Sequence, residues 1–188
     1  GEYIWPKTSS PSLQMLFSEG FIRSFITGDA HYDTWNWKAE EWQPELNKIK
    51  KMFDAVNPNL ETFNQRGAKL IMWNGTLDTS VSARDSVLYY KAVLSTLGQQ
   101  KTDQTLELFL APGVGHCEGG IGPDRVDLMQ ALSKWVETGI PPSQQQLVMT
   151  KVDDGGDIVS SRPMCKYPAF AKYKGKGDIA LAANFICE

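Results

Sequence analysis

The chain begins with two stretches in which apolar side chains recur at helical spacing. The first covers residues 13–24, follows the capping pair Ser10-Pro11 and stops at Gly28, which predicts a helix. The second, over residues 46–56, predicts another helix. Between these two helices, residues 29–44 carry three tryptophans among acidic side chains and are expected to form an irregular loop.

From residue 68 the pattern changes to short apolar runs that alternate with helical stripes. Residues 68–73 form an almost uninterrupted apolar run before Asn74-Gly75, as in a strand buried on both faces of a parallel sheet. Residues 106–110 form a second run, and helical stripes over 87–97 and 128–135 follow the two runs. The order strand, helix, strand, helix indicates an α/β fold with a mostly parallel sheet.

The amino-acid composition limits the kinds of protein that this chain can be. Apolar residues make up 41% of the 188 positions, enough for the core of one domain or of most of a larger one. The 19 basic and 22 acidic residues are interspersed, so we expect no nucleic acid partner. No run approaches the roughly 20 apolar residues of a spanning helix, so we expect no membrane segment and a soluble mature chain. Gly1 is preceded by neither Met nor a signal peptide, so either processing has removed the front or the sequence is a piece of a longer polypeptide.

The three cysteines are an odd number. If the protein is secreted, two of them can pair within the chain and the third must pair elsewhere. Cys165 and Cys187 bracket a tail that is rich in Pro, Gly and Lys and that follows a predicted strand over residues 147–149. Closing a loop of that size stabilises a fold by about 3 kcal/mol in the chain-entropy picture. Cys117 is then the unpaired cysteine.

Two polar residues follow the predicted strands. Asp78 lies five residues beyond Trp73, and His116 lies six residues beyond Leu110 in a glycine-rich segment. Functional groups gather at the carboxyl ends of the strands in open α/β sheets, so we expect Asp78 and His116 to lie close together. An Asp bonded to one imidazole nitrogen fixes the tautomer and stabilises the imidazolium that forms when the other nitrogen takes a proton. The two residues therefore suggest a general base and its acid partner.

Other interpretations of these residues stay open. An Asp after a strand is commonly a turn former or a helix N-cap, and a lone His in a loop is commonly a satisfied surface group. A metal site is a further alternative, although the spacing of its candidate ligands fits no regular pattern. Those candidates are His116, Cys117, Glu118 and Asp124.

A nucleophile is missing from the sequence. Gly-x-Ser-x-Gly does not occur, and Ser80, Ser82 and Ser86 follow Asp78 too closely to be independent partners. Acid followed by base, at consecutive strand ends, is the order of the α/β-hydrolases, in which the nucleophilic serine comes earlier in the chain. The chain thus holds two members of a three-residue triad.

A set of short segments occurs in a fixed order along most of the chain. They are residues 20–23, Arg66-Gly67-Ala68-Lys69-Leu70-Ile71, Asn74-Gly75-Thr76-Leu77-Asp78, Gly113-Val114-Gly115-His116-Cys117-Glu118-Gly119-Gly120, residues 135–139, Ser161-Arg162-Pro163-Met164-Cys165-Lys166-Tyr167-Pro168, residues 173–178 and residues 184–187. The ordered set resembles the C-terminal part of the tannase and feruloyl esterase family, with residues 20–23 similar to the end of that family's lid.

The resemblance implies a secreted serine esterase with an α/β-hydrolase core and an inserted lid, acting on phenolic esters. It makes Asp78 the triad acid and His116 the base, and it agrees with pairing Cys165 to Cys187. In the family a disulfide joins the Cys after the catalytic His to a Cys immediately before the catalytic Ser. Cys117 therefore matches a half-cystine whose partner, like the Ser, is outside this sequence. The family's calcium site lies in the lid ahead of this chain, so we expect no cofactor and no metal ligand here.

The resemblance also implies an organisation into three parts. Residues 1–28 would end the lid, residues 29–142 would form the C-terminal part of the α/β-hydrolase core with the acid and the base, and residues 143–188 would add a strand and a disulfide-stapled tail. The N-terminal part of the same enzyme is the expected partner, and this chain alone is expected to be inactive. The competing hypothesis is a non-catalytic α/β accessory or binding subunit that retains the family motifs.

Some residues carry open questions of their own. Trp73 and Asn74 replace the Tyr and His that are common in the family's turn. Asn74-Gly75-Thr76 is also an N-glycosylation sequon, which we expect to be unoccupied because a glycan would crowd the acid. Four aromatic side chains could stack on a phenolic ring, with ordinary packing as the alternative. These are Tyr3, Trp5, Trp35 and Trp37.

Overall fold

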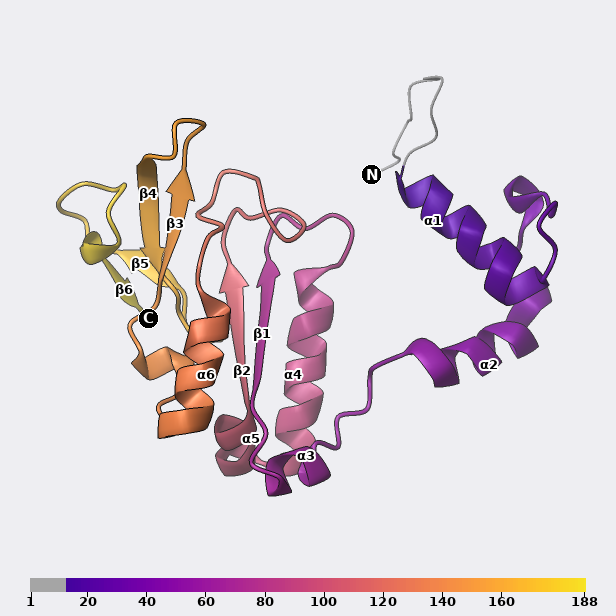
Figure 1. Cartoon of the computed structure of the whole chain (residues 1–188), viewed down its shortest axis with the longest axis horizontal. Coiled ribbons are helices and arrows are strands. Elements are labelled where there is room, and N and C mark those ends of the chain that lie inside the picture. Colours follow the sequence, from indigo (N-terminus) through magenta and orange to yellow (C-terminus); the bar gives the residue numbers. More distant parts are fainter. Residues whose placement is uncertain (1–12) are drawn as a thin grey trace. The chain divides into compact units, whose positions relative to one another are not determined.

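The computed structural model describes residues 13–188 (Figure 1), and the chain divides into two compact units, with the boundary in the sequence between Val56 and Asn57. The predicted capping pair Ser10-Pro11 lies outside the described residues. Across the described part of the chain, no helix combines the length and apolar character that crossing a bilayer requires.

The first unit contains the two predicted helices. Helix α1 (Leu13–Phe21) continues as a π-helical stretch (Ile22–Thr27) and ends at Gly28, which adopts the left-handed conformation that glycine tolerates best. Helix α2 (Gln43–Phe53) ends three residues before the predicted end at residue 56.

The segment between these helices is more regular than the predicted loop. It contains two short 3-10 helices, Thr34–Asn36 and Ala39–Trp42. The carboxylate of Asp33 accepts a hydrogen bond from the backbone N–H of Trp35 and so begins the first of them.

The second unit is built on a parallel pair of strands, which confirms the predicted α/β fold. Strand β1 (Leu70–Gly75) pairs with β2 (Leu106–Ala111), and Gly75 lies opposite Ala111 at the carboxyl ends. Helix α3 (Glu61–Gln65) precedes β1, helix α4 (Ala83–Leu97) follows it, and helix α6 (Leu128–Thr138) follows β2 (Figure 1). Helix α5 (Gln99–Thr105), which the sequence did not predict, begins directly after the Gly98 that ends α4.

Each face of the strand pair packs into its own core, because side chains alternate along a strand. Leu70, Met72 and Leu108 face α4 and pack with Tyr90 and Val93. The opposite face packs with residues near α6 and β3; its members are Ile71, Trp73, Phe109, Ala111, Val114, Leu128, Met149 and Met164. The expectation that residues 68–73 form a strand buried on both faces is wrong for β1, whereas β2 is buried along almost its whole length. In β1 the side chains from Leu70 to Trp73 are only half-buried, because among the described residues β1 pairs on one edge alone.

The C-terminal tail forms two antiparallel hairpins. Strand β3 (Val148–Val152), predicted over residues 147–149, pairs with β4 (Ile158–Pro163), and β5 (Ala171–Tyr173) pairs with β6 (Phe185–Cys187).

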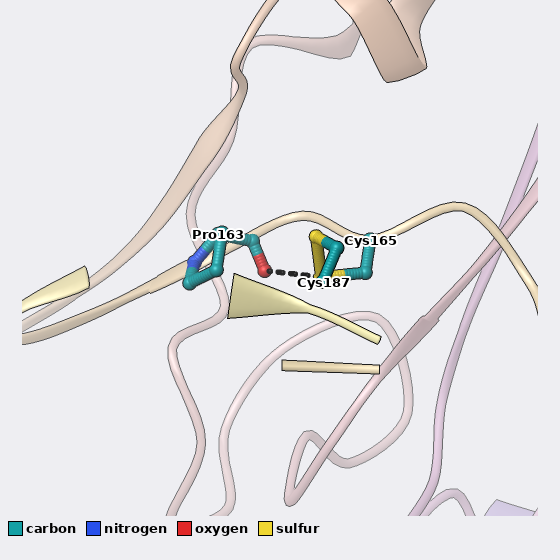
Figure 2. The surroundings of a disulfide bond; sticks show 3 residues. All are labelled: Pro163, Cys165 and Cys187. Atoms are coloured by element: carbon teal, nitrogen blue, oxygen red, sulfur yellow. Dashed lines mark hydrogen bonds between the residues drawn. A yellow bond between two sulfur atoms is a disulfide. The ribbon is translucent and has the colours of Figure 1, made fainter. Parts of the chain in front are cut away.

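A disulfide within this tail and a hydrogen bond from the tail to β2 hold it in place. The predicted disulfide joins Cys165 to Cys187 just after β4 ends at Pro163 (Figure 2). The backbone N–H of Tyr167 donates to the carbonyl of Leu108 at 2.7 Å, so the disulfide-bonded segment lies against the edge of β2.

Candidate active site

Asp78 and His116 lie side by side in the loops that follow β1 and β2. His116 Nδ1 lies 2.9 Å from Asp78 Oδ2, which confirms the predicted proximity. A carboxylate can only accept a hydrogen bond, so Nδ1 is the donor in this pair and Nε2 is the nitrogen left to accept a proton. The Asp78 side chain is 5% exposed, whereas that of His116 is 56% exposed.

The Asp78 carboxylate is held by backbone donors as well as by the histidine. Its Oδ1 accepts the N–H groups of Ser80 and Val81, both at 2.8 Å. The hydrogen bond from Val81 lowers the pKa of Asp78 most, followed by that from His116, while burial acts in the opposite direction. Asp78 is therefore a fixed, ionised acceptor at neutral pH.

The loop that carries His116 is bonded directly to the loop that carries Asp78. Leu77 N–H donates to the carbonyl of Val114 at 2.9 Å, and Gly113 N–H donates to Thr76 Oγ1 at 3.0 Å. Gly75 makes this approach possible, because a side chain there would collide with the backbone carbonyl oxygens of the His116 loop.

Asp124 anchors the far end of the same loop. Its carboxylate accepts the N–H of Gly119 at 2.7 Å and the ammonium of Lys151 at 2.9 Å. These bonds lower the pKa of Asp124 against the opposing effect of burial. Asp124 is thus occupied as an anchor, and among residues 13–188 no three His, Cys, Asp or Glu side chains group to hold a metal ion. Sequence reasoning missed the bond to Lys151, since nothing local signals a partner 27 positions away.

A shallow depression lies in front of the pair, lined by Trp73, Asn74, Gly75, Asp78, Val81, His116 and Cys117. Cys117 is exposed there as a free thiol with a positive φ of 65°. Within the described part of the chain, no serine hydroxyl is bonded to His116. Ser82 caps α4, and Ser86 donates to Asn74.

Of the four candidate aromatic residues, Tyr3 and Trp5 lie outside the described residues. Trp35 and Trp37 belong to the first unit, where Trp35 is 80% exposed and Trp37 is half-buried. A role for them in stacking on a substrate ring stays a prediction.

We expect Gly75→Ala to destabilise the second unit by about 1–3 kcal/mol, because the added methyl group meets the carbonyl oxygens of Val114 and Gly115. Urea unfolding measures this effect. Gly20→Ala, in the first unit, is the control for the exchange itself, since apart from its own helix backbone and chain neighbours no atom lies within 4 Å of a Cβ there. Equal stability of Gly75→Ala and the wild type would show that the two loops can separate at little cost.

The lowered pKa of Asp78 gives its contribution to stability a definite pH dependence. The contribution is present above the pKa of an unfolded Asp, about 3.9, and is lost as the pH falls through the lower pKa of the folded state. The difference in unfolding free energy between the wild type and Asp78→Asn should therefore shrink from pH 6 toward about pH 2. Asp154→Asn, in an exposed turn, is the control and should keep the wild-type pH profile. A difference that stays constant with pH would contradict the assignment.

Comparisons with known proteins agree with this geometry. The family model described as "Tannase and feruloyl esterase" matches residues 4–188. The chain is 38% identical over 133 residues to mono(2-hydroxyethyl) terephthalate hydrolase of Piscinibacter sakaiensis, which covers 71% of this chain and 22% of that protein. It is 29% identical over 177 residues to feruloyl esterase B of Aspergillus niger, which covers 83% of this chain and 34% of that protein.

The structure of feruloyl esterase B from Aspergillus oryzae superposes with a TM-score of 0.81 at 22% identity, over 92% of this chain and 37% of that one. The fold is accordingly part of an α/β-hydrolase core. The chain spans between about a fifth and a third of the length of these curated relatives. With its family model matched along nearly its whole length, the chain belongs to the tannase and feruloyl esterase family.

Proposed function

We propose that this chain supplies the acid and the base of a secreted serine carboxylesterase that hydrolyses esters of phenolic acids. Asp78 is the acid, His116 is the base, and the nucleophilic serine comes from a part of the protein outside this sequence. The observation that carries the proposal is the 2.9 Å contact between His116 Nδ1 and a carboxylate that backbone donors already hold in place.

In this mechanism the serine hydroxyl attacks the ester carbonyl and passes its proton to Nε2 of His116. Asp78 stabilises the imidazolium, which then protonates the departing alcohol. Water attacks the acyl-enzyme by the same route, with His116 again accepting the proton and returning it to the serine. Donors for the oxyanion would come largely from the part of the enzyme outside this chain.

Two relatives suggest the substrate class. Their names describe a feruloyl esterase and a hydrolase of mono(2-hydroxyethyl) terephthalate, and both substrates are esters of an aromatic acid. Gallate, ferulate, another hydroxycinnamate and a terephthalate-like monoester are therefore the acids to test. Residues 1–28, as the end of a lid, would help to select among them.

The cysteines support secretion. A disulfide such as Cys165–Cys187 persists in oxidising compartments. Cys117 would pair with a Cys next to the nucleophilic serine, and its exposed thiol beside His116 is suitably placed for that bond.

In the complete enzyme, Asp78→Asn should lower kcat about ten-thousand-fold while the fold persists, because the amide favours the wrong imidazole tautomer. Hydrolysis of methyl ferulate, methyl gallate and mono(2-hydroxyethyl) terephthalate measures the rate, and circular dichroism checks the fold. Asp154→Asn is the control. A near-normal rate for Asp78→Asn would rule out its role as the acid, and full activity of the present chain alone would rule out an external serine.

Cys117 should be inaccessible to thiol reagents in the complete protein, because it is bonded to a cysteine outside this sequence. Alkylation with maleimide before and after reduction, followed by intact mass measurement, tests this. Cys117→Ser should release one reactive thiol at the partner cysteine. Labelling of Cys117 without reduction would exclude the proposed disulfide.

A second candidate function is a non-catalytic accessory or binding subunit, favoured by the lack of a serine bonded to His116 among the described residues. The sequence that precedes this chain distinguishes the two. A Cys-Ser pair followed by glycines favours the esterase, and its absence favours the subunit.

A further inference from the structure

Asn74 occupies a buried position between β1, the Asp78 loop and α4. The residue immediately precedes Gly75 in the chain and is only 9% exposed. Its Oδ1 accepts a hydrogen bond from the Ser86 hydroxyl on α4 at 2.8 Å. Its Nδ2 donates to the carbonyl oxygens of Gly75 and Val81, both at 3.3 Å. The sequon nitrogen is thus turned into the protein, where a glycan has no room.

These contacts reach the proposed acid through one residue. Asn74 holds the carbonyl of Val81, and the N–H of the same Val81 donates to Asp78 Oδ1. The hydrogen bond from that N–H is also the largest cause of the lowered pKa of Asp78. Displacing Val81 therefore moves the donor on which the position of Asp78 depends.

We propose that Asn74 is a positioning residue for the Asp78–His116 pair: its amide fixes Val81 between β1 and α4, and Val81 in turn fixes the carboxylate of Asp78. The effect of Asn74 on catalysis rests on the proposed function, in which Asp78 and His116 are the acid and the base. Asn74 acts through Val81 and has no bond to His116.

An amide suits this position because it both donates and accepts. Its Nδ2 donates a hydrogen bond to the Val81 carbonyl, and its Oδ1 accepts one from the Ser86 hydroxyl. An Asp of the same shape keeps the acceptor, loses the donor and sets a carboxylate against a carbonyl oxygen. Asn74→Asp thus removes the proposed link to Val81 with little change in volume.

The first test is kinetic and uses the complete protein. Asn74→Asp and Asn74→Ala should each lower kcat for a phenolic ester about 10- to 100-fold, with KM within about twofold, as expected for a misplaced catalytic group. If Asn74→Ala fails to fold, Ser86→Ala replaces it and should show a smaller fall in kcat of the same kind.

The control removes a part-buried hydrogen bond far from the pair. Ser143→Ala deletes the 2.6 Å bond from its hydroxyl to Glu107, a residue 1% exposed near the start of β2. It should reduce stability and leave kcat within about twofold of the wild type. If the Asn74 variants lose no more kcat than Ser143→Ala does, Asn74 is merely structural and the proposal is overturned.

The second test does not depend on esterase activity. NMR follows the His116 Nδ1 proton and the titration of the Asp78 carboxyl carbon, with His31→Gln leaving His116 as the single histidine of this chain. Asn74→Asp should shift the Nδ1 proton and raise the pKa of Asp78, whereas Ser143→Ala should change neither. Unchanged signals overturn the inference. If the signals shift in Asn74→Asp but the complete wild-type protein has no esterase activity, the positioning role is upheld and the proposed function is rejected.

Discussion

The site depends on the parallel register of β1 and β2, which ends both strands at the same level. Because Gly75 lies opposite Ala111, the two following loops leave the sheet side by side. The missing side chain at Gly75 then lets the backbone of the second loop come against the first. The contact between Asp78 and His116 is a consequence of this close approach, and it needs no contribution from the first unit.

A carboxylate as buried as that of Asp78 is tolerated because its oxygens accept hydrogen bonds from several donors. Two backbone N–H groups and one imidazole N–H provide them, and all three come from loops that the strand ends hold in place. The His116 loop is secured in the same manner at its far end, where Asp124 joins Gly119 to Lys151 on β3. The acid and the base are therefore placed by a rigid scaffold, although both lie in loops.

The parts of the fold that could be predicted are those with a local signal. Apolar runs and helical stripes predicted β1, β2, α4 and α6, and the position of polar residues after two strands predicted the Asp78–His116 pair. Helix α5 gave no such signal, because it is polar and is placed by buried threonines and by the Gly98 before it. The hairpins of the tail, the Asp124–Lys151 bond and the role of Asn74 depend on contacts between distant positions, which periodicity does not record.

The organisation of the pair has a consequence for how a complete enzyme would assemble. Among residues 13–188, the hydrogen bonds that orient Asp78 and His116 come from positions between Asn74 and Lys151, so acid and base are prearranged within the second unit. An external serine then needs only to be brought to Nε2 of a histidine whose side chain is 56% exposed. In the proposed enzyme a disulfide from Cys117, the next residue in the chain, would restrict the distance between that serine and His116. The disulfide would therefore limit the distance from the serine hydroxyl to His116 Nε2, which the second unit cannot set by itself.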